Sequence, residues 1–114
     1  MMHLVVIILN KFECLEELLV RFAEGGISGA TVIESTGMAR VLGGKDDLRI
    51  FDSLRMMFSP VREENRTIFT VLPEEKIPAV KQIVTDVVGD LSKPDTGIMF
   101  AVPVSFTAGI GGAE

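Results

Sequence analysis

The sequence has few of the side chains on which catalytic centres and disulfides depend. Its 114 residues include no Trp, no Tyr, one histidine (His3) and one cysteine (Cys14). A single cysteine excludes an internal disulfide and is typical of a reducing compartment, so we expect a cytoplasmic protein. With one histidine and no Ser-containing elbow motif, no nucleophile, base and acid can be combined, and we expect no enzyme activity.

Basic clusters and long apolar runs are also missing. The chain carries 11 Lys and Arg against 16 Asp and Glu, a formal net charge of −5, and no two basic residues are adjacent. Because binding to a nucleic-acid backbone requires a basic stripe, we expect no nucleic-acid partner. The apolar run at residues 4–9 is too short for a membrane span or a signal-peptide core, so we expect no membrane insertion.

What the sequence does contain is the apolar content of a globular domain. Hydrophobic residues make up 47% of the chain and the mean hydropathy is +0.40. A chain of this length forms one core, so we expect a single domain over residues 1–114. Such a small domain cannot bury all of its apolar surface alone, which favours burial between subunits.

Hydrophobic periodicity predicts four strands and two long helices. Continuous or alternating β-branched runs predict strands at residues 3–9, 30–36, 66–72 and 98–106. Apolar residues at helical spacing predict helices at 12–24 and 73–90, the first ended by the glycine pair at 25–26. A shorter helical pattern at 46–58 predicts a helix inside the long connection between the second and third strands.

This order of elements predicts an α+β fold of the ferredoxin-like type, βαββαβ. Its four-stranded antiparallel sheet has two helices on one face. The other face of the sheet would carry Val, Ile and Phe side chains. Oligomerisation is the natural way to bury them.

Several short sequence motifs also resemble those of a known protein family. The stretch "GISGATVIESTGMAR" (26–40) resembles the segment of PII nitrogen-regulatory proteins in which the second strand enters the T-loop, a long signalling loop. "VLPEE" (71–75) looks like the family's Val-Pro-Asp junction, and "GIMFAVPV" (97–104) is similar to its last strand. Apart from the loop and the tail at 107–114, the resemblance covers most of the chain.

The resemblance implies a homotrimer with effector sites in clefts between neighbouring subunits. In the PII family these clefts hold adenine nucleotides, and the T-loop, here residues 37–65, changes shape with the occupant and docks onto a partner protein. Such signalling is a linkage effect that needs no covalent chemistry or resident cofactor. The chain is therefore expected to bind a small anionic effector, an adenine nucleotide or a related molecule.

The sequence also departs from the family pattern. In place of the Gly- and Lys-rich phosphate-binding loop it has "LSKPDTG" (91–97), followed by Ile98, and "SFTAGIGG" (105–112) has no arginine. Two side-chain cations, Arg40 and Lys93, are few for the three phosphates of ATP. The absence of Tyr excludes the uridylylation switch of enterobacterial relatives. These departures predict a PII-like protein with a shortened loop and its own effector.

On the second strand and the loop, the resemblance points to four candidate ligand-binding residues. Thr31 and Glu34 are expected to contact a base or hold the loop, although such residues also commonly line a sheet face. Gly37 and Arg40 belong to the Gly-x-x-Arg motif at the start of the loop. The guanidinium of Arg40 suits bidentate binding of an anion, and its alternative is a solvated loop arginine.

Two further candidates lie before the last strand. Lys93 and Gly97 are expected to form a reduced ligand-binding loop in which backbone N–H groups replace lost side chains. The alternative is an ordinary Pro-Asp turn.

Two other functions share this fold. One is a trimeric protein that binds divalent metals, similar to the CutA family, which the scarcity of His and Cys argues against. The other is a small ferredoxin-like enzyme acting on a hydrophobic substrate, which the lack of Trp, Tyr and an acid–base cluster argues against.

Overall fold

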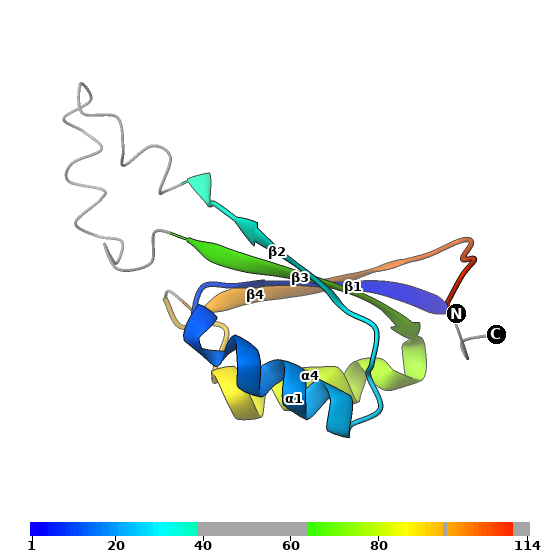
Figure 1. The fold of residues 1–114 in the computed structure, drawn as a ribbon, viewed down its shortest axis with the longest axis horizontal. Helices are drawn as coiled ribbons and strands as arrows, with labels where there is room; N and C mark the ends of the chain where they lie inside the picture. Colours follow the sequence, from blue (N-terminus) through cyan, green and yellow to red (C-terminus); the bar gives the residue numbers. More distant parts are fainter. Residues whose placement is uncertain (39–63, 95, 111–114) are drawn as a thin grey trace.

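The computed structural model describes residues 1–38, 64–94 and 96–110, and it has the predicted architecture. The elements follow the order β1 (Met2–Leu9), α1 (Leu15–Glu24), β2 (Thr31–Ser35), β3 (Asn65–Pro73), α4 (Ile77–Val88) and β4 (Gly97–Pro103). The strands form one antiparallel sheet in the order β2-β3-β1-β4, and both helices lie against the same face of it (Figure 1). The α+β, ferredoxin-like prediction is confirmed.

The core lies between the sheet and the helices because the strands alternate. In β1, Val5, Ile7 and Leu9 point toward the helices and are buried. The apolar stripe of each helix meets them: α1 contributes Leu18 and Phe22, and α4 contributes Val80, Val84 and Val88. The partly buried Cys14 packs against this cluster, so its position suits a small apolar side chain.

Several ends of the elements differ from the predictions by one to four residues. Each helix is preceded by a short 3-10 turn, η1 (Phe12–Cys14) before α1 and η2 (Glu74–Lys76) before α4. The predicted last strand, 98–106, is too long because β4 ends at Pro103, the last residue paired with β1. β4 is an edge strand, where a proline without an N–H costs little.

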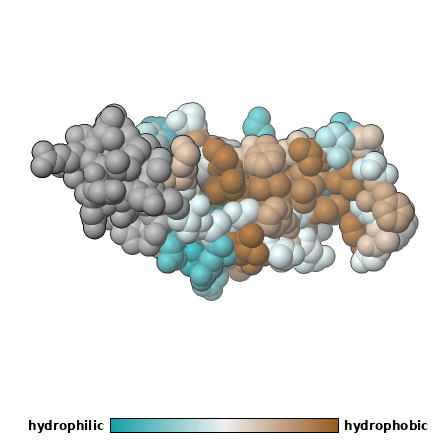
Figure 2. All heavy atoms as spheres, turned by 90° about the horizontal axis from the view of Figure 1, so that it is seen from above, coloured by the Kyte–Doolittle hydropathy of each residue, from teal (hydrophilic) through white to brown (hydrophobic). Residues whose placement is uncertain are grey.

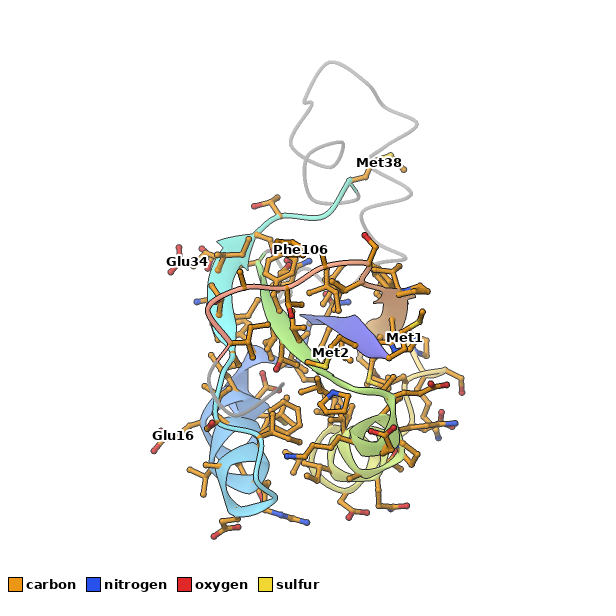
Figure 3. The ribbon with its side chains drawn as sticks, turned by 90° about the vertical axis from the view of Figure 1, so that its right-hand side faces the viewer. Met1, Met2, Glu16, Glu34, Met38 and Phe106 are labelled. Carbon is orange, nitrogen blue, oxygen red and sulfur yellow. The ribbon has the colours of Figure 1, made fainter. Side chains whose placement is uncertain are left out.

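The sheet face away from the helices is apolar and carries no helix; within the described chain, only the segment that follows β4 crosses it, at one end (Figure 3). The strand register aligns three cross-strand rows on it. Figure 2 looks onto this face and shows hydrophobic residues gathered into a continuous patch. We call it the open face; its apolar residues are Leu4, Val6, Ile8, Ile33, Phe69, Val71, Ile98, Phe100 and Val102.

Both edges of the sheet carry segments that the resemblance assigns to the site. The edge strand β2 leads into the connection at 37–65, and the edge strand β4 follows the turn that contains Lys93. The helix predicted at 46–58 lies outside the described residues, as does most of this connection. The candidate site is therefore built below from the strand ends and the turn.

Candidate functional site

One end of the sheet gathers most of the predicted site residues. Glu34 of β2 pairs in register with Arg66 of β3, Arg66 with Leu9 of β1, and Leu9 with Gly97 of β4. This row crosses the whole sheet at the end where the 37–65 connection begins. Three strand spacings of about 4.8 Å separate its ends, so Glu34 and Gly97 lie roughly 14 Å apart on opposite edges.

Thr31 and Glu34 lie on opposite faces of the sheet and cannot act on the same side of one chain. Thr31 pairs with Phe69 on the open face, in the same cross-strand row as Val6 and Phe100. Glu34 shares the helix side with Arg66, and its side chain points outward from β2 (Figure 3). Only Glu34 belongs to the end of the sheet at which the loop departs.

Arg66, which the predictions did not place in the site, holds the two flanks of the loop together on the helix side. Its Nη2 atom lies 3.7 Å from Glu34 Oε1 and its Nη1 atom 3.3 Å from Glu64 Oε2. Nη1 also donates a 3.2 Å hydrogen bond to Asn65 O, and the guanidinium carbon lies 5.1 Å from the centroid of the Phe12 ring. An arginine is suited to serving several acceptors and a ring at once because its planar fork presents five donors.

A chain of hydroxyl and amide groups joins the same strands on the open-face side. Ser35 Oγ lies 2.7 Å from Thr67 Oγ1 and donates a hydrogen bond to Asn65 Oδ1. Since the single Ser35 proton goes to Asn65, the Thr67 hydroxyl is the donor to Ser35. Asn65 and Thr67 are buried. The last residues before the loop are thus held from both faces of the sheet.

The sequence carried one signal for the contacts of Ser35 with Asn65 and Thr67. Asn65 and Thr67 alternate along β3, and Ser35 lies on β2. All three are polar residues at positions where the apolar open face would continue. Their mutual contact depends on the β2–β3 register, which the sequence does not show.

Gly37 lies next to this hydrogen-bonded group. A Cβ atom added there would meet Asn65 Nδ2 at 3.7 Å, an ordinary contact distance. A side chain at this position is therefore tolerated by the described neighbours, and its role in ligand binding stays a prediction. Arg40, the predicted anion anchor, lies outside the described residues.

The turn before β4 is tied to the end of β1. The N–H groups of Asn10 and Lys11 both donate to Thr96 O, at 3.1 and 3.4 Å, and Thr96 is buried. Gly97 follows with φ +149, and a Cβ atom there would lie 2.6 Å from Ile8 O. The glycine is thus required by the close approach of two strands, which is a reason independent of any ligand.

The other predicted residue of this turn is exposed. Lys93 donates its backbone N–H to Asp90 O at 3.1 Å, and its ammonium group is accessible to an anion. Its role in binding stays a prediction.

Asp90 begins the turn by accepting hydrogen bonds from Ser92 Oγ at 2.7 Å and Ser92 N at 2.9 Å. These two bonds, the side-chain bond first, lower the pKa of Asp90 below its ordinary value of 3.8. A carboxylate with a depressed pKa in the folded state contributes stability above its unfolded pKa and loses it as the pH falls through the folded pKa.

We therefore expect Asp90→Ala to lower the urea midpoint slightly at pH 7, and by less at a pH below the folded pKa, where the wild-type carboxyl is protonated. Ser92→Ala should reproduce this pattern, and the double variant should be no less stable than the worse single one. Equal losses at both pH values would contradict the role of the charged carboxylate.

Two further properties bear on the alternatives. Within residues 1–38, 64–94 and 96–110, no three His, Cys, Asp or Glu side chains are grouped so that they could hold a metal ion. In the same part of the chain, no helix is both long and apolar enough to cross a membrane.

Solved structures with little sequence similarity share this fold. Arabidopsis thaliana PII bound to citrate aligns with a TM-score of 0.65 and 16% identity, over 99% of this chain and 83% of the other. A functionally unknown protein from Pediococcus pentosaceus ATCC 25745 aligns with a TM-score of 0.63 and 16% identity, over 96% of this chain and 97% of the other. No protein-family model and no curated protein matches the sequence. The likeness to these structures is one of fold.

Proposed function

We propose that the protein is a PII-like signal-transduction protein that works as a homotrimer and has no enzyme activity. A small anionic effector, an adenine nucleotide, binds in clefts between neighbouring copies. The connection at 37–65 reports its presence to a partner protein. The fold shared with Arabidopsis PII supports this class of function. The resemblance of segments 26–40 and 97–104 to PII sequences supports it independently.

The separation of the candidate residues is the observation that carries the proposal. Glu34 and the loop root lie on the β2 edge, while Lys93 and Gly97 lie on the β4 edge, roughly 14 Å away across the sheet. A small ligand that uses both groups needs two copies, the β2 edge of one facing the β4 edge of the next. The open face supports such an assembly because several of its apolar side chains are exposed in the single chain: Ile33, Ile98, Phe100 and Val102.

Charge favours an effector with few phosphates. Arg66, the cation nearest to the loop root among the described residues, already serves Glu34 and Glu64. The predicted site then relies on Lys93 and on Arg40 of the loop. We propose that ADP or AMP binds more tightly than ATP, because two cations neutralise one or two phosphates better than three.

A first experiment measures thermal unfolding with AMP, ADP and ATP. A nucleotide at 100 times its dissociation constant should add about 2.7 kcal/mol to native-state stability. If none of the three nucleotides raised the unfolding temperature, the result would contradict the proposal.

A second experiment tests whether each cleft draws on two copies. Arg40→Glu and Lys93→Glu should each abolish ADP binding in isothermal titration, whereas Lys81→Glu, an exposed lysine of α4, should not. When the two inactive variants are co-expressed, clefts that combine the intact edge of each should bind ADP again. Random assortment around a closed ring predicts recovery of about a quarter of the sites. If the site lay within one chain, co-expression would recover none.

A further inference from the structure

The two halves of the candidate site are joined, within one chain, by residues 10–12. On one side, the Phe12 ring lies under the guanidinium of Arg66, which holds the loop flanks at Glu34 and Glu64. On the other side, the N–H groups of Asn10 and Lys11 hold the carbonyl oxygen of Thr96. Phe12 N donates a 2.8 Å hydrogen bond to Asn10 O, which makes the three residues one compact turn.

The position of Arg66 depends more on Phe12 and the backbone than on its ion pairs. The Arg66 side chain is 19% exposed, but that of Glu34 is 78% exposed and lies 3.7 Å away. An exposed ion pair contributes little, because water screens it and two long side chains must be ordered. The ring of Phe12 and the Asn65 carbonyl, by contrast, offer the guanidinium a ring face at 5.1 Å and a backbone acceptor at 3.2 Å.

We propose that Arg66 is a positioning residue that, through Phe12, sets the loop root relative to the Lys93–Gly97 turn. A ligand that displaces the turn of one copy then displaces Thr96, the turn at 10–12 and Arg66 in sequence, and so changes the anchoring of the loop of that copy. The regulatory meaning of this link rests on the proposed function. The link itself is a property of the ligand-free chain and can be measured without an effector.

The test compares backbone amide resonances of the ligand-free variants. Arg66→Gln should move the resonances of residues 35–37, 10–12 and 96–97. Arg21→Gln is the matched control, because Arg21 is also a partly exposed arginine paired with a carboxylate, Asp86 at 3.6 Å, but it lies on α1. We expect the control to leave all three segments at their wild-type positions.

A second variant tests the path. Phe12→Leu removes the ring face but keeps an apolar side chain, and should move the resonances of both 34–35 and 96–97. If Arg66→Gln and Phe12→Leu each perturb only their direct neighbours and residues 96–97 stay unchanged, the proposal is overturned. Arg66→Lys keeps the charge without the planar fork and should resemble Arg66→Gln at residues 96–97. If Arg66→Lys left the resonances of residues 96–97 at their wild-type positions, this result would also contradict the proposal.

The same variants separate a positioning role from a merely structural one. Each should weaken ADP binding about 5-fold with the trimer intact, and the double variant should be no weaker than the worse single one. Additive losses would overturn the path through Phe12. If wild-type protein binds no nucleotide, the proposed function fails while the resonance test still decides whether the link exists.

Discussion

Phe100→Asp is expected to break the assembly into folded monomers. Phe100 lies in the middle row of the open face, aligned with Val6 of β1 and through it with Phe69 of β3. It is 48% exposed in the single chain. If copies cover this face, the new carboxylate is buried there without a partner, which costs about 3 kcal/mol or more at each contact and weakens association over 100-fold.

Val20→Asp is the matched control for this prediction. Val20 is 50% exposed, nearly the same as Phe100, but it lies on helix α1, away from the open face. Light scattering after size-exclusion chromatography should find trimers for the wild type and the control, and monomers for Phe100→Asp. Circular dichroism should show the same secondary structure for all three. A Phe100→Asp variant that remains trimeric would mean that the open face does not form the interface.

Gly97→Ala is expected to destabilise the fold strongly, whether or not a ligand is bound. Its φ of +149 is rarely adopted by L side chains, and the added Cβ would lie 2.6 Å from Ile8 O, a backbone atom of the central strand. Strand β4 must move away from β1 or twist at its first residue. We expect a loss of about 3 kcal/mol in the free energy of unfolding, or roughly 12 °C in the unfolding temperature.

Gly29→Ala is the control for the glycine prediction. A Cβ atom at Gly29 has no neighbour within 4 Å, so urea unfolding should change by less than about 0.5 kcal/mol. Equal stability of Gly97→Ala and the wild type would show that the two strands separate readily. The comparison also guards against a false reading, because a loss of ligand binding in Gly97→Ala could reflect the displaced strand rather than a lost contact.

Much of the fold could be predicted from the sequence because local signals agree. The β-branched run of β1 and the apolar stripes of α1 and α4 each indicate one kind of element, and the glycine pair after α1 ends it at the expected place. The end of the last strand was predicted wrongly. β4 stops three residues early because pairing with β1 ends at Pro103, and pairing is not a local property.

The candidate site could be predicted from the sequence only in part. Thr31 and Glu34 were predicted together to contact a base or hold the loop, but they are three residues apart in a strand, and alternation places them on opposite faces. The ligand-binding role of Gly97 stays a prediction, and the structure supplies a steric reason for a glycine at this position. The contact of Arg66 with Phe12, 54 positions earlier in the chain, had no signature in either segment.

The sequence by itself determined the class of the fold and the order of its elements. These depend on periodicity, turn residues and composition, which are properties of neighbouring residues. Only the tertiary structure decided that the two halves of the candidate site lie on opposite edges of the sheet. It also decided that residues 10–12 join them. These features arise from strand register and from contacts between segments far apart in the chain, and register is set when the whole sheet forms.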